Sequence, residues 1–136
     1  MKLLKLTLLL VLTTHCQVAK KTMIDRNLHK AIEAHFEGAV NTTPNSTGSF
    51  VVVTQAKEPS MEVPVNALKF AIYDAQKQKI VYVEQKYNAQ VSWYNNETLF
   101  VKSRPGVKSN DAETDRAMRE YYINVKTLEK VTLPPR

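Results

Sequence analysis

Cysteine is nearly absent from this sequence: Cys16 is the only one among 136 residues. An intramolecular disulfide is therefore excluded. Small secreted domains of animals and plants usually depend on such bonds, because their cores are small, whereas bacterial envelope proteins commonly fold without them. The cysteine count favours a bacterial protein whose core is held by packing alone, and roughly 120 residues are enough to bury such a core.

Histidine and glycine are also scarce, with three of each. His29 and His35 are six positions apart on a predicted helix, so they point to different sides, whereas metal ligands on one helix face are three or four apart. His29 with Glu33 is a surface pair of the kind that solubilises a helix. The three glycines form neither a phosphate-binding loop nor a Gly-x-Ser-x-Gly nucleophile turn. The sequence predicts no metal, no cofactor and no catalytic residue.

The charge balance is mildly basic, with 19 Lys and Arg against 13 Asp and Glu. Removing Lys2 and Lys5 with a leader leaves 17 against 13. The pair Lys20-Lys21 is too short a run to indicate nucleic-acid binding. We therefore expect no nucleic acid as a partner.

The first sixteen residues have the pattern of a secretory signal. Lys2 and Lys5 precede the apolar run Leu6 to Leu12, and polar residues follow it up to Cys16. The apolar run is too short to cross a bilayer as a helix. The sequence predicts a signal peptide over 1–16, a mature chain starting near Cys16 or Gln17, and an extracytoplasmic location, in the periplasm or outer envelope of a bacterium.

Cys16 leaves two interpretations open. In a lipoprotein signal the cysteine after the apolar run carries the lipid, but Leu usually stands three places before it and a small residue directly before it, where this chain has Thr13 and His15. In an ordinary signal, Thr14 and Cys16 are the small residues that the peptidase recognises. Lipidation of Cys16 would tether the protein to a membrane, and the second interpretation leaves it free.

Three Asn-x-Ser/Thr triplets, at Asn41, Asn45 and Asn96, would be glycan acceptors in a eukaryotic secretory pathway. Nine asparagines in a Thr-rich chain produce such triplets by chance. They weigh only weakly against a bacterial origin.

One amphipathic helix is predicted over 22–38, with Thr22 as its cap and Gly38 at its end. Its apolar stripe recurs every four residues and should face a partner surface. The stripe consists of Ile24, Leu28, Ile32 and Phe36. The segment 41–48 (NTTPNSTG) has turn chemistry and predicts a linker.

From Ser49 onward the apolar period changes to two, which is typical of strands. The predicted strands are 50–54, 68–73, 80–83, 89–94, 98–102 and 121–126, with a short helix within 110–120 capped by Asn110 or Asp111. Ile80 to Val83 is apolar at every position, so the sequence does not decide which of these side chains face the core. The alternation around the turn at Asn95-Asn96 is the strongest hairpin signal.

These elements predict an α+β fold: one domain over 17–136, whose β-rich part, 49–131, is a mostly antiparallel meander of five to six strands with the helix packed on one face. The expected helix-facing core contains Leu68, Phe70, Ile72, Val91, Trp93, Leu99, Val101, Ile123 and Val125. The opposite face of the sheet would then be exposed.

That opposite face carries an aromatic and basic strip. Its predicted binding residues are Tyr73, Tyr82, Tyr94, Phe100, Tyr122, Lys102 and Lys126, with Lys69 beside them. Tyrosine combines a flat apolar ring with a polar tip, and lysine attracts anions, so the strip could hold a polysaccharide, an anionic envelope polymer or a partner protein. The competing interpretation is structural, because aromatic pairs stabilise strands and lysines protect sheet edges whether or not anything binds.

Two classes of function follow. The first is an exported, non-catalytic binding module of the bacterial envelope, lipid-anchored or secreted. The alternative is a small exported enzyme or enzyme inhibitor that works through the loops 57–64 and 104–114, which are longer than connection alone requires. A pocket lined by converging Asp, Glu or His side chains would favour the enzyme, and a flat face with exposed tyrosines would favour the module.

Overall fold

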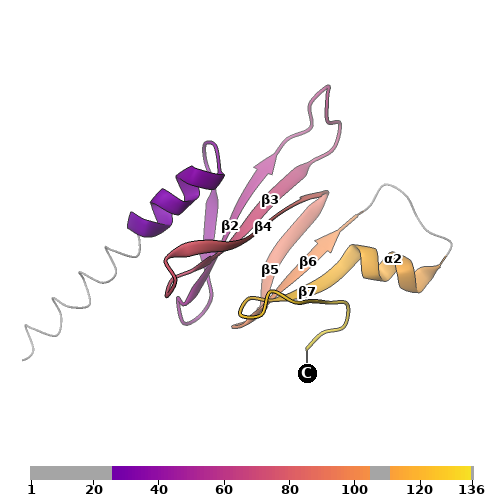
Figure 1. The fold of residues 1–136 in the computed structure, drawn as a ribbon. Helices are drawn as coiled ribbons and strands as arrows, with labels where there is room; N and C mark the ends of the chain where they lie inside the picture. Colours follow the sequence, from indigo (N-terminus) through magenta and orange to yellow (C-terminus); the bar gives the residue numbers. More distant parts are fainter. Residues whose placement is uncertain (1–25, 105–110, 136) are drawn as a thin grey trace, which may run out of the picture.

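The computed structural model describes residues 26–104 and 111–135 (Figure 1). The predicted signal 1–16 with Cys16, the predicted cap Thr22, and Ile24 of the apolar stripe lie outside the described residues. Within them, the N-terminal helix covers 26–35. The remaining elements are β1 Asn41–Pro44, β2 Phe50–Lys57, β3 Ala67–Asp74, β4 Lys79–Tyr87, β5 Ala89–Asn95, β6 Thr98–Ser103, α2 Ala112–Arg119, β7 Glu120–Asn124 and β8 Lys130–Val131.

The strands form two antiparallel sheets of four strands each. The first sheet has the order β1-β2-β3-β4 and the second has the order β5-β6-β7-β8, so every neighbour in space is also a neighbour in sequence. The expectation of an α+β chain with antiparallel strands in meander order is confirmed. The expectation of five to six strands in one sheet is wrong, because the described part of the chain has eight strands in two sheets.

The predicted linker 41–48 is wrong in its first half. Asn41–Pro44 is an edge strand that pairs with β2, with Asn41 opposite Thr54 and Pro44 opposite Val51. Proline is tolerated on an edge strand because no neighbour needs its missing N–H. Strand β8 was also not predicted, since two residues are too few to show an alternation.

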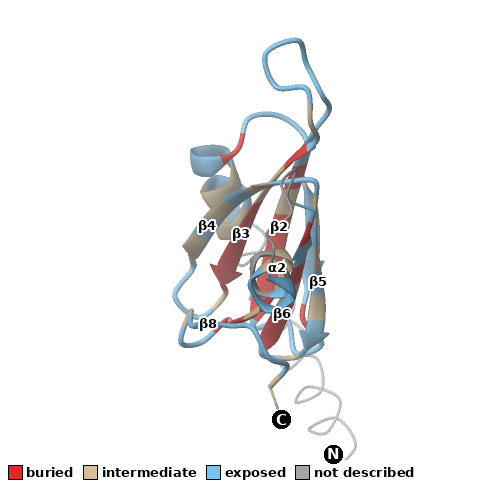
Figure 2. Ribbon diagram, turned by 90° about the vertical axis from the view of Figure 1, so that its right-hand side faces the viewer, coloured by how far each residue is buried: buried red, intermediate tan, exposed pale blue. Residues whose placement is uncertain are grey.

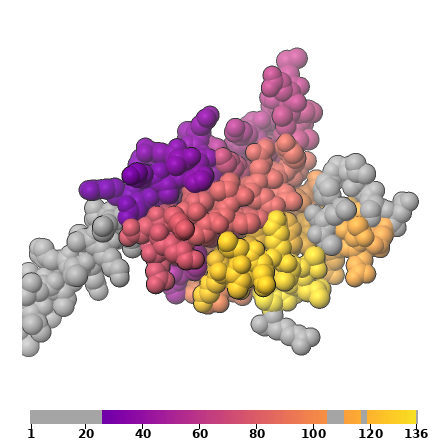
Figure 3. Space-filling view, viewed as in Figure 1, coloured from indigo at the N-terminus to yellow at the C-terminus, as the bar shows by residue number. Residues whose placement is uncertain are grey.

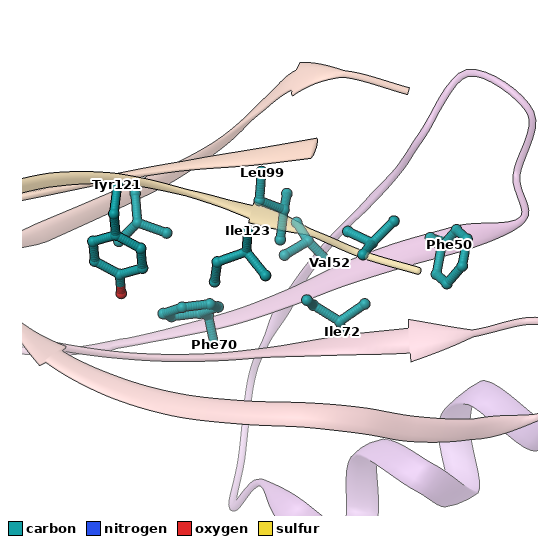
Figure 4. Packing of buried hydrophobic residues seen from close by; sticks show 9 residues of the cluster. Phe50, Val52, Phe70, Ile72, Leu99, Tyr121 and Ile123 are labelled. Atoms are coloured by element: carbon teal, nitrogen blue, oxygen red, sulfur yellow. The ribbon is translucent and has the colours of Figure 1, made fainter. Parts of the chain in front are cut away.

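A closely packed apolar core joins the two sheets (Figure 4). Phe70 and Ile72 of β3 meet Leu99 of β6 and Ile123 of β7, and all four are completely buried. Burying one such side chain stabilises the fold by about 1.5–3 kcal/mol. The buried residues of this inter-sheet core are Phe50, Val52, Phe70, Ile72, Leu99, Val101, Tyr121, Ile123 and Val125. Figure 2 shows the burial concentrated in the strands β2, β3 and β6.

The N-terminal helix packs on the other face of the first sheet. Its side chains Leu28 and Ile32, with Phe36 just beyond it, contact Val53 and Ala71. The amphipathic helix is therefore confirmed over its described residues, but the predicted core partner is wrong. Residues expected to face the helix, such as Phe70 and Leu99, lie between the two sheets instead, because alternation tells which residues share a face and not which layer covers that face.

Gly38 ends the helical region as predicted, although the helix itself stops at residue 35. Its backbone is left-handed, with φ of 84°, which favours glycine and reverses the chain after a helix. The buried Gln55 side chain donates hydrogen bonds to the carbonyl oxygens of Glu37 and Ala39 on both sides of Gly38. This contact fixes the chain between helix and β1 to the sheet.

A bulge in β4 decides the facing of the all-apolar segment Ile80 to Val83. Tyr73 lies opposite Ile80 and Ile72 opposite Tyr82, so Val81 is an extra residue. Val81 and Tyr82 therefore both pack on the inter-sheet core, while Ile80 packs on the helix side.

The chain passes from the first sheet to the second at a corner made by Asn88. Its φ is 49°, its N–H donates to Asn66 O at 2.8 Å, and its carbonyl accepts from Arg104 N at 3.1 Å. Five residues later, Trp93 Nε1 donates to the carbonyl of Thr43 on β1. Strand β5 thus begins beside the start of β3 and ends beside β1 at the far edge of the first sheet.

At the other end of the molecule, Asn45 ties the turn after β1 to the turn after β5. This side chain is 6% exposed. Its Oδ1 accepts from Phe50 N, and its Nδ2 donates to Ser49 Oγ and to Asn96 O at 2.9 Å. Because Nδ2 is the atom that would carry a glycan, Asn45 is engaged in the fold and not free as an acceptor.

We expect Asn45→Ala to lower the free energy of unfolding by about 2–3 kcal/mol, because it leaves Phe50 N–H and Asn96 O without their partner. Urea denaturation followed by tryptophan fluorescence measures the loss. Asn41→Ala, at an exposed position of β1, is the matched control and should change stability by less than about 0.5 kcal/mol. Equal losses in the two variants would contradict the role of Asn45.

Candidate functional site

The outer face of the second sheet carries three aromatic side chains, which we call the aromatic row: Tyr94 of β5, Phe100 of β6 and Tyr122 of β7. Phe100 and Tyr122 are directly opposite each other, with ring centroids 5.1 Å apart. Tyr94 meets Tyr122 edge-on at 5.0 Å. Val131 of β8 is opposite Tyr122 and is also exposed, so the row continues across all four strands.

Tyr94 faces outward by the ordinary alternation of β5, and a second bulge lies at this residue. Trp93 pairs with Leu99 and Asn95 pairs with Thr98, which leaves Tyr94 as the extra residue. Trp93 packs on the inter-sheet core, while Tyr94 is 49% exposed. Bulges redirect side chains and are frequent beside functional sites.

The two predicted lysines of this face lie at opposite ends of the row, and each is neutralised. Lys102 Nζ is 3.3 Å from Glu120 Oε1. Lys126 Nζ donates to Glu97 Oε1. The strip is therefore aromatic, as predicted, but its lysines contribute little net charge.

Tyr73 and Tyr82 were expected on this face, and that expectation is wrong. Tyr73 belongs to the first sheet, is 0% exposed, and its hydroxyl has no hydrogen-bond partner in the described part of the chain. Burial, and then the Asp74 carboxylate, raises the pKa of Tyr73. Tyr82 lies between the sheets, 6.0 Å from the ring of Phe70.

Lys69, also expected beside the strip, belongs to the helix side of the first sheet. Its ammonium lies 5.0 Å from the centre of the Phe36 ring and donates to the carbonyl of His35. The sequence pattern placed these residues wrongly because it treated two sheets as one.

A second group of polar side chains, not predicted from the sequence, joins the edges of the two sheets. We call it the Glu84 cluster: Glu84 and Tyr82 of β4, Tyr121 of β7 and Lys130 of β8, with Lys86 beside them. Glu84 Oε2 accepts from both tyrosine hydroxyls, at 2.9 Å from Tyr121, and Glu84 Oε1 accepts from Lys130 Nζ at 2.9 Å. Lys130 also lies over both tyrosine rings. The side chain of Glu84 is 14% exposed.

The electrostatics of the Glu84 cluster favour the charged carboxylate. Burial by itself would raise the pKa of Glu84, but the hydrogen bonds from Tyr82, Lys130 and Tyr121 outweigh it and hold this pKa below its ordinary value. Burial and the bond to Glu84 raise the pKa of Tyr121. The bonds to Tyr82 and Glu84 raise the pKa of Lys130, against the effect of burial.

The Glu84 cluster is suited to holding the edges of the two sheets together. Glu84 stays ionised, and the groups around it keep their protons, so the cluster links β4 to β7 and β8 by charge-assisted hydrogen bonds. The signal that could have found it is the run Tyr82, Glu84, Lys86, in which polar groups occupy alternate positions and therefore share one face of the strand.

A cleft of about 760 Å³ opens at the corner end of the sandwich. The described residues that line it are Ala56, Glu58, Asn66, Ala67, Leu68, Asn88, Ala89, Gln90, Lys102 and Arg104. Both loops predicted as functional begin at this cleft, one at Glu58 and the other at Arg104, while 105–110 of the second loop lie outside the described residues. The loop after β2 projects from the body of the molecule (Figure 3).

The histidines of the described helix form no ligand set. His29 Nε2 is 3.2 Å from Glu33 Oε1, and both side chains are exposed. Across residues 26–104 and 111–135, no group of three His, Cys, Asp or Glu side chains gathers closely enough to hold a metal ion.

Comparisons with protein-family models, with curated proteins and with solved structures give no match for this chain. None of the helices within the described ranges has the length and apolar character needed to cross a membrane.

We expect Glu84→Gln to lower the free energy of unfolding at pH 7 by about 1–3 kcal/mol, because a neutral amide replaces a buried charge-assisted acceptor. The pKa of Glu84 is lowered in the folded protein, so its stabilising effect is present above the ordinary carboxyl pKa of about 4.5 and is lost as the pH falls through the folded value. The difference between wild type and variant should therefore shrink below about pH 4.

Urea denaturation at several pH values measures this difference. Glu97→Gln, which removes an exposed partner of Lys126, is the control and should cost less than about 1 kcal/mol. A loss that is the same in both variants, or that does not depend on pH, would contradict the fastening role of Glu84.

Proposed function

We propose that this chain is an exported, non-catalytic binding module of the bacterial envelope, and that it holds an uncharged stretch of polysaccharide on its aromatic row. The observation that carries the proposal is the row itself: Tyr94, Phe100 and Tyr122 come from three adjacent strands, the ring of Tyr122 contacts both of the others, and Tyr94 is 49% exposed.

The chemistry of the row suits a sugar chain better than a polyanion. A tyrosine ring offers an apolar surface to the C–H face of a sugar ring, and its hydroxyl can exchange hydrogen bonds with sugar hydroxyls. An anionic polymer would instead need free cations, and the lysines at the ends of the row have Glu120 and Glu97 as partners. A strand-built platform is also rigid, so little conformational entropy is lost on binding.

Export belongs to the proposal through the pattern of residues 1–16. A protein tethered by a lipidated Cys16, or released after cleavage near Gln17, would meet envelope polysaccharides outside the cytoplasm. Both forms are compatible with the binding face, which is made of residues 94–131.

The alternative, a small exported enzyme or inhibitor that works through loops 57–64 and 104–114, is supported by one observation. The corner cleft lies where both loops begin. Its described lining contains one carboxylate, Glu58, and no histidine, so it offers a binding site more readily than acid and base partners.

We expect Tyr94→Ser to weaken retention on an insoluble polysaccharide by about tenfold or more, as the loss of an aromatic contact does in other interfaces. Sedimentation with cellulose and with peptidoglycan sacculi measures the bound fraction. Because the contact is uncharged, binding should change little between about 0.05 and 0.5 M salt.

Tyr87→Ser is the matched control, since Tyr87 is 51% exposed on β4 of the other sheet, against 49% for Tyr94. It should bind like the wild type. Equal binding by both variants, or no binding of the wild type to either polysaccharide, would overturn the proposed ligand.

The intact mass of the protein recovered from its native host tests whether the protein is exported. We expect a mature chain that begins at Cys16 with added acyl groups, or an unmodified chain that begins near Gln17. A mass that corresponds to the full chain from Met1 would contradict export.

A further inference from the structure

The side chains between the two sheets become smaller toward the corner at Asn88. The cleft described above, which we call the corner cleft, opens at that end. At the end that holds Asn45, positions between the sheets are filled by large residues such as Phe50 and Trp93. Further along the same strands, the alternation places Ala56 of β2 and Ala89 of β5 between the sheets, with Leu68 of β3. Two alanines cannot fill the space that Phe50 and Trp93 fill, so an apolar floor is left open to solvent.

The two walls of the cleft differ in charge. The first sheet contributes Glu58, which follows β2, while the second contributes Lys102 and Arg104 at the end of β6. Lys102 is balanced by Glu120 at 3.3 Å. Arg104 has no carboxylate partner among the described residues. One wall therefore presents an acid and the opposite wall presents an available guanidinium.

We propose that the corner cleft binds a short peptide of about three residues with free termini, its carboxylate on Arg104 and its ammonium on Glu58. Two residues with side-chain amides, Asn66 and Gln90, also line the cleft. Guanidinium groups bind carboxylates through two parallel hydrogen bonds. The cleft contains none of the three aromatic side chains of the row, although Lys102 of the predicted strip also lines it, and its proposed ligand does not depend on the polysaccharide proposal.

An extended tripeptide spans about 10 Å, at about 3.3–3.6 Å per residue, so its two charged termini are far enough apart to reach groups on different sides of the cleft. The cleft of about 760 Å³ lies within the range of small-molecule sites, about 300–1,000 Å³. The alanine floor leaves room for small apolar side chains between the charged termini.

The test is an NMR titration of the full mature chain with trialanine, observed on backbone amide signals. We expect shifts at Ala56, Leu68 and Ala89, whereas the amides of the aromatic row stay unchanged. Amidation of the peptide carboxylate and Arg104→Gln should each weaken binding by about tenfold. Combined, they should weaken binding no more than either alone, because both remove the same ion pair.

N-acetylation of trialanine and Glu58→Gln should likewise each weaken binding by about tenfold, because both remove the ion pair at the ammonium end of the peptide. Ala56→Leu, at an exposed position, should fill the floor and abolish the shifts without unfolding the chain. Lys79→Gln, on the distant start of β4, controls for the loss of one positive charge and should bind like the wild type.

The proposal is overturned if trialanine shifts no cleft amide at about 10 mM, which corresponds to roughly 3 kcal/mol of binding free energy. It is also overturned if the acetylated or amidated peptides bind as tightly as the free one.

Discussion

The face-to-face packing of the two sheets is the contact on which the rest of this structure depends. Phe70 from one sheet and Leu99 and Ile123 from the other are completely buried between them. A strand points alternate side chains to opposite sides, so each residue that enters this core fixes its neighbour on the outside. Because Leu99 and Val101 point inward, Phe100 must point outward and join the aromatic row.

The same packing explains the polar contacts at its margins. The edges of a sandwich are where strands from different sheets end side by side, and polar groups there must find partners across the gap. Glu84 does so on one edge, by accepting hydrogen bonds from Tyr121 and Lys130 of the other sheet. Asn45 does so between two turns, by donating to Asn96 O. Both residues act as fasteners of a core that is apolar in its middle.

The cleft and the aromatic row both follow from the alternation of side chains along the strands. The cleft arises where core positions shrink to Ala56 and Ala89, so the sheets have too little side chain between them to close the end. Tyr94 faces outward because its neighbour Trp93 packs on the inter-sheet core. The first arrangement makes a concave cleft, and the second makes a flat face.

Local patterns in the sequence were sufficient for the individual elements. The alternation about Asn95-Asn96 predicted the hairpin of β5 and β6, the apolar stripe with Leu28 and Ile32 predicted the described part of the amphipathic helix, and Asp111 was correctly expected as a cap of the short helix α2. Strand β1 was not predicted, because Pro44 and the turn residues beside it usually indicate a loop.

The sequence by itself determined which residues share a face within each strand, because that follows from the period of two. Only the tertiary structure decided which layer covers each face. The pairing of strands into two sheets buried Tyr73 on the helix side, brought Tyr82 between the sheets, left Tyr94, Phe100 and Tyr122 together on an outer face, and joined Glu84 to Tyr121 from 37 residues away. These outcomes depend on contacts between distant segments, which no local periodicity contains.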